Sequence, residues 1–193
     1  MFDLKAKIKE RKPKIGDTLF IAIDGHGGSG KSTLADILSG KLDATLIRTD
    51  DFASWENPFN WYTDVIEKVF KPILNGAKEL HYQPTSWWEN HNPELVTKSV
   101  TPVMILEGVS SSRKEFRDYI SLSIFVNTPR EICLTRGVER DLQSNTRKSE
   151  EELSKMWKTW FAEEDVYMRR DNPKDHVDIV VSGTRPVEEQ IQF

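Results

Sequence analysis

The stretch Gly25-His26-Gly27-Gly28-Ser29-Gly30-Lys31-Ser32 fits the pattern G-x-x-x-x-G-K-[ST] of a phosphate-binding loop. A short apolar run with β-forming residues, 19–24, precedes it, and residues 33–42 follow with leucines and an isoleucine at helical spacing. The loop is therefore predicted to join a buried strand to the N-terminus of a helix. Glycines let successive N–H groups point inward and the helix dipole adds positive potential, so the stretch predicts a nucleotide site.

Each part of this loop has an expected role. Lys31 can reach the β- and γ-phosphates, and the hydroxyl of Ser32 can ligate Mg²⁺. The residues expected to bind the nucleotide are Gly25, His26, Gly27, Gly28, Ser29, Gly30, Lys31, Ser32 and Thr33. The alternative is a glycine-rich turn that matches the pattern by chance, and the flanking strand and helix favour the nucleotide site.

Length and composition narrow the class of protein. A chain of 193 residues is expected to form a single domain over 1–193 with its own core. Its net charge of −4 provides no basic surface, which argues against a nucleic-acid partner. The single cysteine, Cys133, excludes an internal disulfide, agrees with a reducing compartment and is expected to be a buried small residue. With no membrane-length apolar run and no signal-peptide core, the chain is expected to be soluble and cytoplasmic, with no membrane partner.

The pattern along the chain alternates strands with helices. A solvated leading helix is expected before Pro13. Strands are predicted at 19–24, 44–49, 103–106, 121–126 and 177–181, and helices at 33–42, 62–73, 129–140 and from a capping box at Ser149 to Asn172, with Pro72 kinking or restarting the second helix. This order predicts an α/β fold of three layers around a central, mainly parallel five-stranded sheet. Ligands bind at the carboxyl ends of such strands.

Three candidate groups fall at strand ends. They are the phosphate loop, the pair Asp50 and Asp51 after 44–49, and Glu107 after 103–106. Phosphoryl transfer needs a cradle for the phosphates, a metal and a group that orients the attacking oxygen. Ser32 with an acidic residue can hold Mg²⁺, and an Asp can orient an acceptor hydroxyl. The alternatives are a turn or helix cap for the Asp pair and a strand-end acid without a ligand for Glu107.

Two arginines add cationic groups after the fourth predicted strand. Arg136 and Arg140 are four positions apart, on one face of the predicted helix 129–140. The polar segment 141–148 follows them, so closure of this part of the chain would bring both guanidinium groups over the phosphates. A lid is therefore predicted at about 136–148. The alternative is an exposed pair that bonds Glu139 or Asp141.

These motifs together resemble the uridine kinase and phosphoribulokinase branch of the P-loop kinases, and more closely the small bacterial uridine kinase-like proteins. Asp50-Asp51-Phe52 is similar to the Asp-x-Phe of that family, which implies a catalytic Asp50, and Glu107-Gly108-Val109 resembles its Glu-Gly-Ile/Val, which places Glu107 at the metal. The run 136–141 resembles the lid-forming Arg-x-x-x-Arg-Asp, and 177–180 resembles the last strand. The resemblance implies Lys31, Asp50, Arg136 and Arg140 as catalytic residues and Ser32, Asp50 and Glu107 as metal ligands.

The acceptor side departs from the family pattern. Ala53 stands where uridine kinases carry Tyr, Gln83 follows Tyr82 where they carry Asp, and His91 lies at only a loosely comparable place. An insertion at about 53–99 is nonetheless expected to hold the acceptor, because it is rich in aromatic residues. The residues expected to contact substrate are Phe52, Trp55, Trp61, Tyr82 and Trp87, with Trp88 as a further stacking candidate. The alternative is that these aromatics only pack in the core.

The combined interpretation is an ATP- and Mg²⁺-dependent kinase that transfers the γ-phosphoryl group to a hydroxyl of a small molecule. The first choice of acceptor is the 5′-hydroxyl of a pyrimidine nucleoside. The alternatives are a kinase for another acceptor, such as a sugar, a vitamin alcohol or a nucleoside monophosphate, and a non-catalytic nucleotide-binding regulatory protein. The expected partner is the small-molecule acceptor, and homo-oligomerisation is left open.

Overall fold

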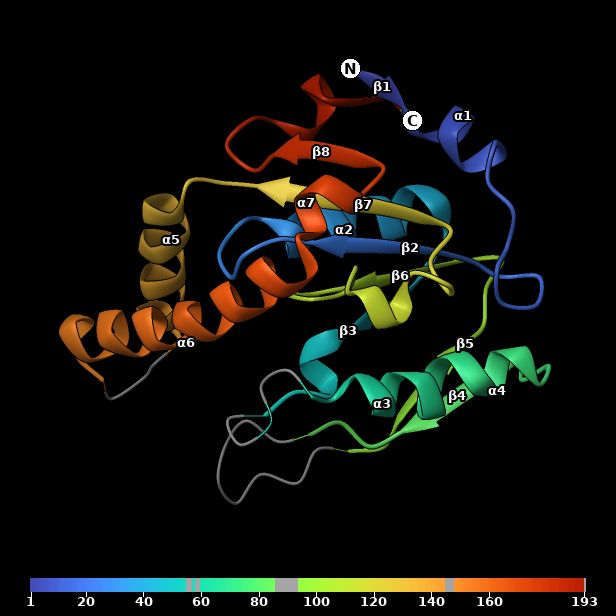
Figure 1. The fold of residues 1–193 in the computed structure, drawn as a ribbon, viewed down its shortest axis with the longest axis horizontal. Helices are drawn as coiled ribbons and strands as arrows, with labels where there is room; N and C mark the ends of the chain where they lie inside the picture. The colour runs from blue at the N-terminus through green and yellow to red at the C-terminus, as the bar shows by residue number, and fades with distance from the viewer. Residues whose placement is uncertain (55–56, 58–59, 86–93, 145–147, 193) are drawn as a thin grey trace.

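The fold is built on a five-stranded sheet, shown at the centre of Figure 1. A computed structural model describes residues 1–54, 57, 60–85, 94–144 and 148–192. The strands lie in the order β3 (Thr45–Arg48), β6 (Val103–Glu107), β2 (Leu19–Asp24), β7 (Leu122–Asn127) and β8 (Ile179–Ser182), and every neighbouring pair is parallel. The three-layer α/β prediction is confirmed. Because β3, β6 and β2 are neighbours, the three groups predicted at their carboxyl ends lie at one edge of the sheet.

The central strand β2 shows why the sheet is covered on both faces. Its side chains alternate, so Phe20 and Ala22 enter one apolar cluster while Ile21 and Ile23 enter another. All four residues are fully buried. A parallel strand buried on both faces reads as a continuous apolar run, which is the pattern that identified 19–24.

One face is covered by α2 (Lys31–Leu42), whose Leu34 and Leu38 pack against Ile21 and Ile23. The short helix α1 (Leu4–Lys9) lies at the same side, and β1 (Phe2–Asp3) pairs in parallel with β9 (Ile191–Gln192) after the turn η4 (Val187–Glu189). The leading segment is therefore less solvated than predicted, because Leu4 is fully buried in this cluster. Figure 1 shows the two chain ends side by side as a result.

The other face is covered by the region predicted as a helix at 62–73. It consists of α3 (Tyr62–Val65), a π-helical turn η2 (Ile66–Phe70) and α4 (Lys71–Leu74), which restarts with Pro72 in its first turn. The antiparallel hairpin of β4 (Glu79–Tyr82) and β5 (Val96–Ser99) packs beside it, as does the turn η3 (Lys114–Phe116). Phe70 is at the centre of this cluster, edge-on to Phe20 and Phe116.

Two long helices, α5 (Arg130–Gln143) and α6 (Glu150–Asp171), lie side by side beyond the carboxyl ends of the strands (Figure 1). The predicted capping box is present, since Ser149 and Glu152 bond each other's backbone N–H, and α6 ends at Asn172 before α7 (Pro173–His176). Cys133 is buried between the two helices, as predicted. Within the described ranges, none of the helices has the length and apolar character needed to span a bilayer.

Candidate active site

The phosphate loop runs from the end of β2 to the first residue of α2. Gly28 and Gly30 have φ angles of 76° and 98°, which favour glycine. A Cβ at Gly28 would lie 2.2 Å from the carbonyl oxygen of Cys133, so α5 packs too closely for any side chain there. The loop conformation therefore depends on its glycines, and it places the N-terminus of α2 at the pocket.

Lys31 points back across this loop. Its Nζ donates a hydrogen bond to the carbonyl oxygen of His26 at 2.9 Å, and the residue is only 6% exposed. The ammonium group is thus held on the inner side of the loop, where it lines the pocket. The position matches the role expected of a lysine that neutralises the terminal phosphates.

The metal ligands predicted at Ser32 and Glu107 are in direct contact. Ser32 Oγ donates to Glu107 Oε1 at 3.2 Å, and Arg48 Nη1 donates to Glu107 Oε2 at 2.8 Å. Burial raises the pKa of Glu107, and Asp50 adds to this, while Lys31 and Arg48 oppose it. No cluster of three His, Cys, Asp or Glu side chains is arranged as a metal site in the described chain. Mg²⁺ keeps several waters and needs few protein oxygens, so the pair Ser32 and Glu107 fits it.

Asp50 and Asp51 point to different places. Both lie in the short turn η1 (Thr49–Asp51) after β3, and Asp50 lines the pocket. Asp51 instead accepts a hydrogen bond from Tyr82 Oη at 2.8 Å, in the hairpin layer. Burial raises the pKa of Asp51, and it also raises that of Tyr82 with a contribution from Asp51. The structure therefore brings Asp50, and not Asp51, to the same cavity as Lys31 and Glu107.

The two predicted lid arginines line the pocket from α5. Arg136 Nη1 donates to the carbonyl oxygen of Gly183 at 2.9 Å, and Arg140 bonds Asp141 at 3.1 Å. The guanidinium of Arg140 also lies over the ring of Trp157, 5.4 Å from its centroid. The alternative pairing with Asp141 is thus present, and it holds Arg140 at the pocket.

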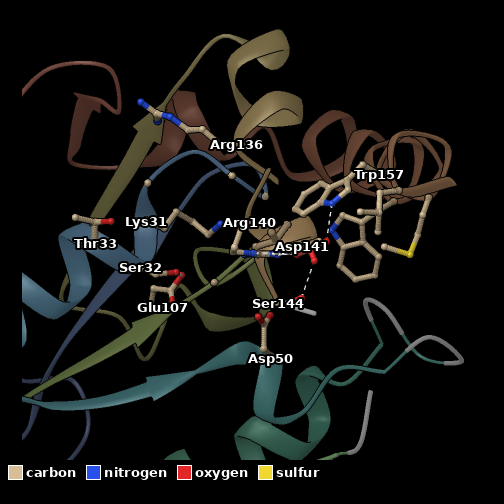
Figure 2. A pocket seen from close by; sticks show the side chains of 18 of the residues that line it. Lys31, Ser32, Thr33, Asp50, Glu107, Arg136, Arg140, Asp141, Ser144 and Trp157 are labelled. Atoms are coloured by element: carbon tan, nitrogen blue, oxygen red, sulfur yellow. Dashed lines mark hydrogen bonds and ion pairs between the residues drawn. The ribbon is translucent and has the colours of Figure 1, made fainter. Parts of the chain in front are cut away.

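These groups surround one pocket of about 490 Å³. In Figure 2 Lys31, Ser32 and Thr33 lie on one side, Trp157 lies on the other, and Asp50 is at the edge between them. The side formed by α6 is apolar and is defined here as the α6 wall: Leu153, Met156, Trp157 and Trp160. Sequence reasoning missed this wall, because the spacing i, i+3, i+4, i+7 signals a buried helix face and does not say what faces it.

Three of the aromatic residues predicted to contact substrate, Phe52, Trp61 and Tyr82, do not line this pocket. Phe52, Trp61 and Tyr82 are 3%, 2% and 2% exposed and belong to the core beneath the sheet. Trp61 packs at 6.1 Å from Phe116, and Phe52 at 4.9 Å from Tyr82. This burial is what the packing alternative predicts, and it corrects the expectation that Trp61 offers a face to a base. Trp55, Trp87, Trp88 and His91 lie outside the described residues.

The predicted lid differs in its secondary structure. Residues 141–143 continue α5 three positions past the predicted end at Arg140, and Trp157 Nε1 donates to Asp141 Oδ2 at 2.8 Å. Residues 145–147 lie outside the described residues, while Ser144 and Lys148 line the pocket.

We expect hydrogen exchange in the segment 141–148 to be fast without ligand and slower with nucleotide plus acceptor. Closure over the phosphates would protect the amides of this segment and exclude water from the transfer step. The measurement is exchange monitored by mass spectrometry in both states, with a peptide from β7 as the invariant reference. Equal exchange of 141–148 in the two states would contradict the lid.

Comparison with known proteins finds uridine kinases among the relatives of this chain. The chain is 27% identical over 179 residues to the curated uridine kinase of Borrelia hermsii, covering 83% of this chain and 84% of that protein. It is 29% identical over 165 residues to the uridine kinase of Mannheimia succiniciproducens, with 73% and 76% covered. A solved structure described as a possible uridine kinase from Bacillus stearothermophilus superposes with a TM-score of 0.60 at 19% identity, over 84% of this chain and 88% of that one.

The chain is similar to curated uridine kinases over most of its length, and it has a P-loop kinase fold. The resemblance inferred from the phosphate loop, Asp-x-Phe, Glu-Gly-Val and the lid arginines is therefore confirmed over most of the chain. No protein-family model matches the chain. The similarity supports a P-loop phosphotransferase, and the choice of acceptor has to come from the site of this chain itself.

Proposed function

We propose that this protein is an ATP- and Mg²⁺-dependent kinase, active in the cytoplasm, that phosphorylates a hydroxyl group of a pyrimidine nucleoside. The observation that carries the proposal is the convergence of Lys31, Asp50, Glu107 and Arg136 on one pocket from four separate elements. Ser32 and Glu107 are the residues that would hold the metal, which supplies charge neutralisation on the phosphates. Asp50 lines the same pocket as Lys31, and a carboxylate that orients an acceptor hydroxyl is what phosphoryl transfer requires beyond nucleotide binding.

The test is a screen for acceptor-dependent release of ADP from ATP, with nucleosides, nucleoside monophosphates, sugars and vitamin alcohols as candidates. We expect uridine or cytidine to give the highest kcat/KM. Release of ADP with a sugar or vitamin alcohol alone would support the alternative kinase. ATP binding without any acceptor-dependent turnover would support the nucleotide-binding regulatory protein instead.

The α6 wall is the surface best suited to the ring of the acceptor. It lies across the pocket from the phosphate loop, and its Met156 and Trp160 are only partly buried, whereas Leu153 and Trp157 are buried. A flat ring can stack on an indole whatever its pattern of hydrogen-bonding groups, so this wall compensates for the missing Tyr-Asp of the family pattern. The proposal thus assigns ring recognition to α6 and not to the buried residues Phe52, Trp61 and Tyr82.

We expect Trp160→Ala to raise the KM for the acceptor about tenfold to a hundredfold, because stacking on one aromatic side chain is worth about 1–3 kcal/mol. The KM for ATP should change little. Steady-state kinetics with each substrate varied in turn measures both constants, and Trp160→Phe, which keeps a ring, is the matched control. An unchanged acceptor KM, or a rise confined to ATP, would remove the acceptor from this wall.

A further inference from the structure

A buried carboxylate outside the pocket holds the phosphate loop. Glu164 on α6 is fully buried, and its Oε1 accepts a hydrogen bond from the N–H of Gly27 at 3.0 Å. Its Oε2 lies 2.7 Å from Nδ1 of His26. Both partners belong to the phosphate loop, so α6 contacts the loop directly through Glu164.

His26 connects this carboxylate to Lys31. The ring of His26 bonds Glu164, and the carbonyl oxygen of the same residue accepts the hydrogen bond from Lys31 Nζ at 2.9 Å. The ring also packs edge-on against Phe161 of α6, with centroids 6.1 Å apart. If His26 lost its hydrogen bond to Glu164, the carbonyl group of His26 that accepts from Lys31 would no longer be held in place.

One turn further along α6, Tyr167 anchors the entry to the loop. Its Oη donates to Asp24 Oδ2 at 2.6 Å, and the other oxygen of Asp24 accepts the N–H of Gly25 at 2.7 Å. Asp24 is fully buried and also bonds Ser112. Burial and the neighbouring Asp24 raise the pKa of Tyr167, which keeps the hydroxyl a donor. Hydrogen bonds therefore tie the loop to α6 in two places, directly at Gly27 and through Asp24 at Gly25.

We infer that Glu164 is a positioning residue that keeps the phosphate loop in its nucleotide-binding form before ATP arrives. The inference rests on the proposed function and concerns the same site. A loop that is already ordered does not have to be ordered on binding, so its affinity for phosphates is higher. The opposing effect is that the carboxylate of Glu164 repels phosphates. It also accepts the hydrogen bond of the Gly27 N–H, which then cannot donate to a phosphate oxygen. Because the two effects change ATP affinity in opposite directions, a binding measurement separates them.

The experiment compares Glu164→Met, which keeps the length of the side chain but removes the acceptors, with Glu164→Gln, which can still accept from Gly27 and donate to His26. Glu163→Met, at the exposed neighbour on the same helix, is the matched control. We expect Glu164→Met to raise the dissociation constant of ATP, measured by calorimetry without acceptor, about tenfold to a hundredfold, as for the loss of hydrogen bonds to a charged group. Glu164→Gln and Glu163→Met should stay within about threefold of the parent protein.

The kinetic readout separates positioning from general destabilisation. Glu164→Met should raise the KM for ATP and leave the KM for the acceptor unchanged, and amide exchange of 25–31 should speed up in the free protein but not at saturating ATP. Unchanged or tighter ATP binding by folded Glu164→Met would overturn the inference, as would an equal loss in Glu163→Met. If Glu164→Met fails to fold, His26→Gln tests the same link, and unchanged ATP binding by it would contradict the proposal. ATP binding is measured without turnover, so a failed acceptor screen leaves this test intact.

Discussion

Lys31→Ala should lower kcat by about 10³-fold, the upper end of what one preorganised cationic or hydrogen-bonding group contributes to a transition state. The lysine supplies a point charge at the terminal phosphates, which backbone N–H groups of the loop cannot replace. Its ammonium already lies on the inner side of the loop, fixed by the carbonyl of His26. The charge is therefore in place without any rearrangement, and its removal is not offset by a neighbouring side chain of the loop.

The same substitution should leave the fold nearly intact. Lys31 is buried at the pocket, and among the described residues its side chain loses one hydrogen bond, to the carbonyl of His26, worth about 1 kcal/mol net. The measurements are steady-state ADP release and thermal unfolding. Lys41→Ala, at the exposed last turn of the same helix, is the control and should match the parent protein in ADP release. Near-normal ADP production by a folded Lys31→Ala protein would refute the assignment of the loop.

Short sequence motifs predicted those parts of the site that are formed by contiguous residues. The phosphate loop and the short runs that follow β3 and β6 are contiguous stretches, and their place at strand ends follows from the parallel order. Asp50 and Glu107 could therefore be expected at one sheet edge before any coordinates were known. The continuous apolar run of β2 likewise signalled a strand covered on both faces.

Contacts between distant segments could not be predicted in the same way. Glu164 reads as one more acidic residue on a charged helix, and only packing of α6 against the loop shows that it meets Gly27. The sequence does not distinguish the surroundings of Trp61 from those of Trp160, yet Trp61 lies in the core and Trp160 lines the pocket. Whether a tryptophan faces the core or the pocket depends on how the layers pack, and the spacing of apolar residues along the sequence does not specify that packing. The π-helical turn 66–70 was missed for a related reason, since its apolar spacing is close to that of an α-helix.

Substitution of the two adjacent aspartates should separate chemistry from packing. Asp50→Asn should lower kcat by about 10²–10⁴-fold, the range for a group that receives or orients a proton in the transition state, while ATP still binds. Asp50 lines the pocket with Lys31 and Glu107, so its carboxylate can accept a hydrogen bond from the acceptor hydroxyl. Phosphoryl transfer through a loose transition state needs little early proton removal, and the orienting role of Asp50 is then the larger part of its effect.

Asp51→Asn should cost far less activity. Its side chain faces the hairpin, where the hydroxyl of Tyr82 donates to it at 2.8 Å, and an asparagine oxygen can still accept that bond. The expected loss is about 1 kcal/mol of unfolding free energy, with kcat within a few-fold of the parent protein. Asp51→Asn is thus the matched control for Asp50→Asn, with the same chemical change one residue away. Steady-state kinetics, ATP binding and thermal unfolding of both variants decide the assignment. A large fall in kcat confined to Asp51→Asn would reverse the two roles, and full activity in both variants would remove the carboxylate from phosphoryl transfer.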